Sequence, residues 1–571
     1  MGQRNSEETG RVEFLSKPLD QLKPHYDVVV IGSGYGGGVA ASRLARCGKS
    51  VCVLERGKEF QPGDFPDTFN TIRREFQVTG SKVRIGARTG LFDMRLGDQV
   101  HVLQGCGLGG GSLINAGVAM RPDARVFEDP VWPDELRTDG LLDEGFERAN
   151  HMLAPTAYHG ASELVKYRAL EVASQPLGNE PHAAPVTITF EDRINDANVA
   201  QPACTLCGDC CSGCNVGAKT TVAATYLADA HAHDAEIFTQ AQVRFLRRED
   251  GHWRIFLRPT PDKASAAGDS EISVSAGVVV LGAGTLGSTE ILLRSRDKGL
   301  ALSDRLGEGF STNGDVIAFG SGADHRVNAI GVGHPPKAEI EPIGASVAGQ
   351  TELRSDDDLD HGMYLQEGVL PSGLASFLPA LFVPGGQILA GAKSLVQGVY
   401  KGPLAHLHTF FLVSHDTAKG RLRIENDVAI ADWPEVAKEP VFTRIDEVLS
   451  KAIAAAGGTY IKNPFAGRLT GEARVTAHPL GGCAMGRSAD DGVVDHSGRV
   501  FDPSAKGSSS IHEGLYVCDG SVMPRSLGVN PLLTIASLAE RTAMLIALGR
   551  GWELDVAPVD TPRRKAKALA S

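Results

Sequence analysis

The sequence predicts an α/β fold, because apolar runs lead repeatedly into glycine-rich turns and then into helical patterning. With the second, sheet-based part of the chain included, the overall class is α+β. The clearest case runs from Tyr26 to Leu44, where a short apolar run typical of a buried parallel strand meets closely spaced glycines and a helix. A similar strand–turn–helix lies at Gly277 to Arg294. From about Val316 to Arg468 the glycine motifs stop and candidate strands such as Leu422 to Ile424 appear, which predicts a second, sheet-based domain.

The first turn has the spacing of a dinucleotide-binding fingerprint. Gly32, Gly34 and Gly37 form a G-x-G-x-x-G pattern, in which the glycines allow a tight turn, approach to a pyrophosphate and close helix packing. A second apolar strand ends in Glu55, whose carboxylate can accept hydrogen bonds from ribose hydroxyls. These features predict a Rossmann-like nucleotide site, with a plain βαβ turn as the alternative. The turn residues that we assign to this site are Gly32, Gly34, Tyr35, Gly36 and Gly37.

Length and composition fit a large, loop-rich enzyme. The chain has 571 residues, 67 of them glycine, and a formal net charge of −12. It can bury a large core, and the negative charge gives no general attraction to nucleic acid, so we expect no nucleic-acid partner. The first 25 residues lack the apolar core of a signal peptide, and no uninterrupted apolar stretch of about 18 residues occurs. We therefore expect a cytoplasmic protein without a transmembrane span.

Five ordered motifs occur along the chain: GSGYGGG at 32–38, GLGGGSLIN at 107–115, GAGTLGSTEILLRSRDKG at 282–299, AHPLGGCAMG at 477–486 and YVCDGSVMPRSLGVNPLLTIASLAER at 516–541. Together they resemble the glucose–methanol–choline (GMC) oxidoreductase family, and within it the cholesterol oxidase-like branch. The resemblance spans nearly the whole chain, from Tyr26 to about Leu548.

The resemblance implies a discontinuous FAD-binding domain and a sheet-based substrate domain. We assign residues 25–125, 220–315 and 470–555 to the FAD-binding domain, 126–219 and 316–469 to the substrate side, and 1–24 and 556–571 to tails. Some relatives carry a flavin-linking His immediately before the position of Asn115; here that residue is Ile114, which indicates non-covalent FAD.

The glycine-rich segment at 107–111 suits backbone lying against a flat ring, because it is too rich in glycine for a helix or strand interior. An ordinary flexible loop is the alternative. With the family motifs, the residues expected to hold FAD beyond the first turn are Glu55, Gly107, Gly110, Gly111, Ser112, Asn115, Gly284, Asp519, Gly520, Asn530 and Pro531.

His478 and Asn530 match the family's His–Asn pair at the substrate face of the flavin. A His can take or give a proton near neutrality, and an Asn amide can donate or accept. The resemblance implies oxidation of a bulky apolar alcohol such as a 3β-hydroxysteroid, with oxygen or a redox partner as electron acceptor. The alternatives are a sugar, glycoside or aliphatic alcohol dehydrogenase of the same family, and an electron-transfer or redox-sensing flavoprotein.

A carboxylate base for double-bond isomerisation in cholesterol oxidases has a motif similar to AEIEP at 338–342. Glu339 and Glu341 are two residues apart, so in an extended strand both would point to one face. Either is a candidate catalytic base, and a solvated carboxylate pair is the alternative.

Five of the chain's ten cysteines lie within eleven residues. Four of them have the C-x2-C-x2-C-x3-C spacing of bacterial ferredoxin-type clusters, although the Pro that usually follows is replaced by Asn215. An iron–sulfur cluster, a zinc site and unligated thiols or disulfides are the three interpretations. The candidate metal ligands are Cys204, Cys207, Cys210, Cys211 and Cys214.

Residues 373–392 are strongly apolar but interrupted by Pro379, Pro384 and a glycine pair. This pattern is poor for a membrane span. It suits a mobile lid or a surface in peripheral contact with lipid, with a buried segment of the substrate domain as the alternative.

Overall fold

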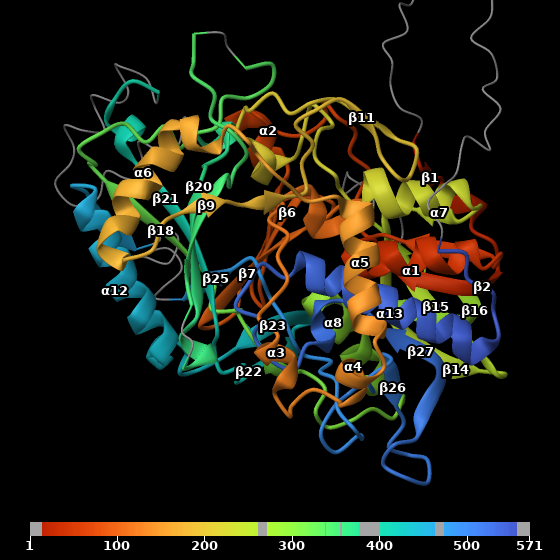
Figure 1. Cartoon of the computed structure of the whole chain (residues 1–571). Coiled ribbons are helices and arrows are strands. Elements are labelled where there is room, and N and C mark those ends of the chain that lie inside the picture. Colours follow the sequence, from red (N-terminus) through yellow and green to blue (C-terminus); the bar gives the residue numbers. More distant parts are fainter. Residues whose placement is uncertain are drawn as a thin grey trace, which may run out of the picture.

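The computed structural model describes residues 14–260, 271–336, 339–354, 357–375, 400–462 and 473–556 (Figure 1). The predicted α/β fold class is confirmed: a large, mainly parallel sheet lies on one side of the molecule and an antiparallel sheet on the other, with smaller sheets between them.

The large sheet has a parallel core flanked by antiparallel strands. Its order is β1 (Ser16–Lys17), β13 (Glu236–Phe238), β3 (Val51–Leu54), β2 (His25–Ile31), β16 (Ile272–Leu281), β15 (His252–Pro259) and β14 (Ala241–Glu249), with β27 (Ile511–Val517) also paired to β16 and β26 (Arg499–Phe501) paired to β27. The apolar strands β2 and β3 are buried as predicted. The sheet thus combines strands from both ends of the chain.

The long strand β16 pairs with two different strands along one of its edges. Its first half pairs antiparallel with β15, from Ile272 to Ala276, and its last three residues pair parallel with β27. Its other edge pairs parallel with β2. Because β2, β16 and β27 run in the same direction, the turns that follow them emerge at one edge of the sheet.

The helices α1 (Tyr35–Arg46), α5 (Leu141–Leu153), α8 (Gly284–Asp297) and α13 (Leu532–Arg550) belong to this half of the molecule, and α13 packs against both α1 and α5 (Figure 1). Among the described residues, α13 alone is long and apolar enough to cross a membrane, but 72% of its apolar window is buried inside the protein. A core helix has the same properties, so α13 is weak evidence for a span. The cytoplasmic location stays a prediction.

The antiparallel sheet has the order β24 (Thr459–Lys462), β18 (Val316–Ser321), β21 (His408–Ser414), β20 (Met363–Gly368), β19 (Gly349–Leu353) and β9 (His182–Ala183). Helices α12 (Pro440–Ala455) and α6 (Val165–Ser174) pack on one face (Figure 1). Most of these strands come from the segment expected to form a sheet-based substrate domain.

Two smaller sheets lie between the large ones. One has the order β25 (Arg474–Thr476), β7 (Val100–Gly105), β6 (Phe92–Arg95), β4 (Phe76–Thr79) and β5 (Arg84–Ile85), and the other contains β17 (Glu308–Phe310), β22 (Gly420–Glu425) and β23 (Val428–Asp432). The strand expected at Leu422–Ile424 lies in β22. Residues 76–105 therefore form a sheet separate from the nucleotide sheet, and the exact domain boundaries stay a prediction.

The remaining short elements connect these layers. They are α2 (Phe69–Arg74), α3 (Arg125–Glu128), α4 (Glu135–Thr138), α7 (Ala228–Ala232), α9 (Ser372–Ala375), β8 (Thr156–Ala157), β10 (Pro185–Val186), β11 (Arg193–Ile194) and β12 (Ala200–Gln201).

A buried ion pair joins α1 to α13. Arg43 donates from Nε and Nη2 to the two carboxylate oxygens of Glu540, at 2.8 and 2.7 Å. Glu540 also accepts a hydrogen bond from Tyr226 at 2.8 Å. Glu540 is 1% exposed. A buried charge pair of this kind fixes the helix register, but loss of one partner strands the other charge away from water.

We predict that Glu540→Ala lowers the free energy of unfolding by about 3–5 kcal/mol, because Arg43 is left buried without its counter-charge. Urea unfolding followed by circular dichroism measures the change. Glu435→Ala, which removes an exposed partner of Lys438, is the control and should leave the unfolding midpoint unchanged. An equal effect of both variants would contradict the importance of the buried pair.

Candidate active site

The predicted cofactor and catalytic residues meet in one cavity of about 510 Å³. It lies at the carboxyl ends of the parallel strands, where open α/β sheets bind ligands. The predicted residues that line it are Gly32, Gly34, Tyr35, Gly36, Glu55, Gly110, Gly111, Asn115, Gly284, His478, Asp519, Gly520, Asn530 and Pro531.

Three predicted residues lie behind this lining and support it. Gly37 packs against the first turn so closely that an added Cβ would lie 2.0 Å from the carbonyl oxygen of Gly32. The carbonyl oxygen of Gly107 lies 3.3 Å from the hydroxyl oxygen of Ser33, and Ser112 accepts a hydrogen bond from the backbone N–H of Val222 at 3.0 Å. These residues shape the backbone around the cavity.

The glycines of the cavity divide into packed and open positions. Gly32 has φ of +91° and an added Cβ there would lie 2.5 Å from Ala283, so the tight turn requires glycine. Around Gly34, Gly111 and Gly284, by contrast, an added Cβ would meet nothing within 4 Å. Their backbone faces open space, as expected where a pyrophosphate and a flat ring system approach the chain closely.

Glu55 holds the first turn in shape. Its carboxylate accepts hydrogen bonds from the hydroxyl of Ser33 at 2.6 Å and from the backbone N–H of Gly57 at 2.7 Å. Since a carboxylate offers about four acceptor positions, Glu55 keeps capacity for a ribose hydroxyl while bracing the loop.

Asp519 joins two distant segments beside the cavity. One carboxylate oxygen accepts from the backbone N–H of Gly284 at 2.8 Å and from Ser288, and the other accepts from Ser521. Burial raises the pKa of Asp519, although these hydrogen bonds oppose the shift. The carboxylate thereby fastens the segment after β27 to the start of α8 at the nucleotide end of the cavity.

Asn115 offers an unsatisfied acceptor within the lining. Its Nδ2 donates to the hydroxyl of Tyr35 at 2.9 Å, whereas its buried Oδ1 has no hydrogen-bond partner among the described residues. Burying an unpaired amide oxygen is costly, so this atom fits a site completed by a polar ligand. Together with the open glycines, Asn115 shows that the cavity fits FAD.

His478 lies beside a buried carboxylate that the sequence analysis missed. Its Nδ1 is 3.4 Å from Oδ2 of Asp315, and both side chains line the cavity. Asp315 is held by the backbone N–H of Ala477 at 2.7 Å. Nδ1 makes no hydrogen bond within the described residues, so its contact with Asp315 is an ion-pair contact only. Asp315 stands outside the family motifs quoted above, so only the fold reveals its position.

Asn530 is fixed from two directions. The side chain of Asn313 accepts from the N–H of Leu527 at 2.8 Å and donates to the carbonyl oxygen of Val529 at 2.8 Å, clamping the preceding loop. The Asn530 Oδ1 accepts from Nε2 of Gln366 at 2.7 Å. Gln366, which also lines the cavity, carries no sequence signal that we used.

Much of the remaining lining is apolar and comes from the antiparallel sheet, the five-stranded sheet, α2 and α9. Phe411 of β21 and Ile317 of β18 are cross-strand partners, so their side chains lie on one face of the antiparallel sheet. The apolar lining comprises Ile72, Phe76, Phe92, Met94, Leu103, Ile114, Ile317, Phe319, Val369, Leu370, Leu374 and Phe411.

The structure does not place Glu339 or Glu341 at this cavity. Both side chains are exposed, and Glu341 forms a surface ion pair with Arg326 at 3.3 Å. Glu339 lies in a turn and Glu341 has no regular secondary structure, so the two do not lie on one face of a strand. A role for either as a catalytic base stays a prediction, which their exposed positions do not support.

The predicted metal ligands are also not assembled into a site. Within the described chain, no group of three or more His, Cys, Asp or Glu side chains is placed to hold a metal ion, and the five cysteines are free thiols. Burial raises the pKa of Cys207 to about 12 and that of Cys211 to about 11. Cys211 lines the cavity. The choice between a metal-bound cluster and unligated thiols stays a prediction.

A buried lysine joins the cysteine segment to the flavin-facing segment. Nζ of Lys219 donates to the carbonyl oxygens of Leu113 at 3.2 Å, Asn115 at 2.5 Å and Cys210 at 3.1 Å. The cysteine segment thus supports the backbone on one side of the cavity.

The apolar segment 373–392 lies mostly outside the described residues. Only Gly373, Leu374 and Ala375 belong to the described part, and Leu374 lines the cavity. The lid and lipid-contact interpretations stay predictions.

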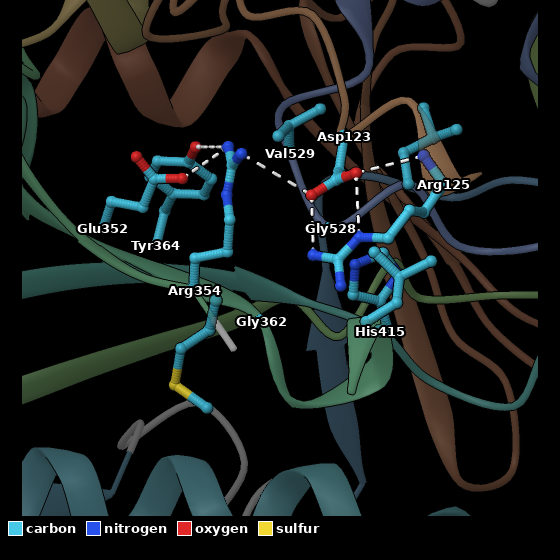
Figure 2. A pocket seen from close by; sticks show the side chains of 12 residues that line it. Asp123, Arg125, Glu352, Arg354, Gly362, Tyr364, His415, Gly528 and Val529 are labelled. Atoms are coloured by element: carbon cyan, nitrogen blue, oxygen red, sulfur yellow. Dashed lines mark hydrogen bonds and ion pairs between the residues drawn. The ribbon is translucent and has the colours of Figure 1, made fainter. Parts of the chain in front are cut away.

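A second, small cavity is lined by the loop 527–529 and by several charged side chains (Figure 2). Arg125 pairs with Asp123 at 2.8 Å, and Arg354 bridges Asp123 and Glu352, so the two positive and two negative charges balance. The cavity volume of about 20 Å³ accommodates about one water molecule. This space is too small for a substrate.

Comparison with protein families decides the classification. Family models described as GMC oxidoreductase match residues 27–311 and 462–539. The chain belongs to the GMC oxidoreductase family. It is accordingly an FAD-dependent oxidoreductase that acts on alcohols.

The curated relatives and solved structures agree with this family. A cholesterol oxidase of Mycobacterium tuberculosis is 28% identical, covering 92% of this chain and 91% of its own length. A long-chain-alcohol oxidase of Arabidopsis thaliana is 25% identical, covering 90% of this chain and 66% of its own. A fungal aryl-alcohol oxidase structure shares the fold with a TM-score of 0.58 at 16% identity, covering 93% of this chain and all (100%) of its own.

We predict that Gly34→Ala lowers the flavin content of the purified protein at least several-fold, because the added methyl group points into the space open to the cofactor. Absorbance at the flavin band relative to protein measures it. Gly549→Ala is the matched control, since its Cβ also meets nothing but lies near the end of α13, away from the cavity. Equal flavin content in both variants would contradict the assignment.

Proposed function

We propose that this enzyme oxidises the hydroxyl of a bulky apolar alcohol, such as a 3β-hydroxysteroid, to a ketone. The observation that carries the proposal is the mixed polar and apolar lining of a single cavity. Polar groups of His478, Asp315 and Asn530 share it with a broad wall of aromatic and aliphatic side chains. Such a wall stabilises an apolar body by burial at roughly 25 cal/mol per Å², but offers few partners to the many hydroxyls of a sugar.

The sheet register supports a location for the reacting hydroxyl. Gln366 of β20 faces Phe411 of β21, which in turn faces Ile317 of β18. Polar and apolar lining therefore meet at Gln366, whose side chain contacts Asn530. We place the substrate hydroxyl at this boundary, with the apolar body along Phe411 and Ile317.

His478 is the proposed proton acceptor. With a proton on Nδ1 facing Asp315, its Nε2 takes the hydroxyl proton of the alcohol as the carbon–hydrogen bond breaks. Asn530 donates an amide N–H to the substrate oxygen and so fixes the carbon for transfer. Bound FAD would supply the hydride acceptor. Asp315 then stabilises the imidazolium that forms.

We predict that His478→Ala slows alcohol-dependent flavin reduction by about 10²–10⁴-fold, the range expected for loss of a general base. Asp315→Asn should slow it less, because the base remains but its orientation and charge stabilisation are lost. Anaerobic stopped-flow absorbance measures both rates. Unchanged flavin reduction in His478→Ala would support an electron-transfer or redox-sensing flavoprotein instead.

Substrate class is tested by anaerobic flavin bleaching with three alcohols. We predict the fastest flavin reduction with a 3β-hydroxysteroid, slower reduction with a long-chain primary alcohol and none with an alkyl glucoside. The steroid buries the largest apolar area, whereas the glucoside would bury hydroxyl groups without hydrogen-bond partners. Preference for the long-chain alcohol would favour the aliphatic alternative. Preference for the glucoside would contradict the proposed substrate class.

Molecular oxygen is the proposed electron acceptor, supported by relatives that are named as oxidases. Two electrons and two protons leave the alcohol, and oxygen accepts them to give hydrogen peroxide. We predict one peroxide per ketone in air. An iron–sulfur cluster does not enter this proposal. Stoichiometric iron and acid-labile sulfide in anaerobically purified protein, with little peroxide, would instead assign the electrons to a redox partner.

A further inference from the structure

Three strands of the antiparallel sheet align a row of polar side chains that ends at Asn530. His182 of β9 faces Gln350 of β19, and Gln350 faces Gln366 of β20. Cross-strand partners of this kind lie on the same face of a sheet. Gln350 and Gln366 are buried, whereas His182 is exposed. The row therefore leads from the surface into the wall of the cavity.

Hydrogen bonds along this row use both amide protons of Gln366. Its Nε2 donates to Oε1 of Gln350 at 3.0 Å and to Oδ1 of Asn530 at 2.7 Å. Gln350 in turn contacts the ring of His182, with 3.1 Å between the two Nε2 atoms. The three side chains thus form one connected set of polar contacts, in which Gln366 donates to both of its amide neighbours.

Gln366 contacts the Asn530 oxygen more closely than the Asn530 nitrogen. Asn530 Oδ1 accepts the short bond from Gln366, which occupies one of its two lone pairs. Asn530 Nδ2 makes only a long contact of 3.4 Å to Gln366 Oε1, and an amide nitrogen carries two protons. At least one N–H donor of Asn530 is therefore available.

We propose that Gln366 is a positioning residue, which fixes the Asn530 amide so that it donates, and does not accept, toward the oxygen of the substrate. The inference rests on the proposed role of Asn530 in alcohol oxidation and deepens it. A donor is the group required, because negative charge grows on the substrate oxygen as its proton moves to His478. An inverted amide would present an oxygen lone pair to that charge.

Two variants of similar volume separate orientation from packing. Gln366→Glu removes both donors, so it abolishes the short bond to Asn530 Oδ1 and offers a carboxylate that draws the Asn530 N–H groups away from the cavity. Gln366→Met removes all hydrogen bonding and leaves Asn530 without a fixed orientation. Thr351→Val is the matched control: it removes a buried hydroxyl bonded to Ser174 at 2.6 Å in the adjacent strand, outside the cavity lining.

The first readout is anaerobic flavin reduction by alcohol. We expect Gln366→Glu to slow the reduction about 100-fold, the size of losing one donor to a developing oxygen charge, and Gln366→Met to slow it about tenfold. Thr351→Val should react like the parent protein. Flavin content and unfolding temperature identify folded variants. A parent-like rate in both folded Gln366 variants would overturn the inference.

The second readout is binding of the ketone product by titration calorimetry, which needs no turnover. A ketone oxygen can only accept a hydrogen bond, so its affinity reports whether Asn530 donates. We expect about tenfold weaker binding to Gln366→Glu and unchanged binding to Thr351→Val. Unchanged ketone affinity in Gln366→Glu would contradict the proposed orientation.

A double-variant cycle with Asn530→Ala tests whether Gln366 acts through Asn530. If it does, adding Gln366→Met to Asn530→Ala slows the reaction little further. Fully multiplicative effects would assign Gln366 an independent role and overturn the inference. A parent-like rate in Asn530→Ala alone would instead refute the proposed catalytic role of Asn530, so the two failures are distinguishable.

Discussion

The whole site depends on the alignment of parallel strand ends in the large sheet. Ile31 of β2 pairs with Leu54 of β3 and with Leu281 of β16, and Leu281 pairs with Val517 of β27. Because the four strands end in one row, the segments that follow them open onto the same edge. Residues that are far apart in the chain thereby form one cofactor cavity, which Asp519 fastens together.

In the proposed function, chemistry and specificity come from the other side of the cavity, where the antiparallel sheet supplies part of the wall. Its cross-strand rows change from polar to apolar at Gln366, and the loop carrying Asn530 meets them there. His478 arrives from the C-terminal part of the chain with Asp315 behind it. A hydroxyl on an apolar body matches this arrangement, since each half of the substrate meets surface of its own polarity.

Local patterns allowed much of the fold and part of the site to be predicted. The glycine turn after β2, Glu55, His478 and Asn530, all singled out from their motifs, line the same cavity. Asp315 and Gln366 could not be found in this way, because their roles arise from contacts between distant strands. Glu339 and Glu341 are exposed, because spacing alone does not say which face of a segment is buried. The cysteine spacing suggested a metal site, but within the described residues no group of three or more ligand side chains is placed to hold a metal ion.

The central claim is that one cavity binds FAD and an apolar alcohol with the reacting oxygen between His478 and Asn530. A crystal structure of the FAD-loaded enzyme with the ketone product of a 3β-hydroxysteroid tests it most directly. The account predicts that the ketone oxygen lies within hydrogen-bond distance of His478 Nε2 and Asn530 Nδ2, with the apolar body along Phe411 and Ile317. A ketone bound with its oxygen away from both residues would contradict it.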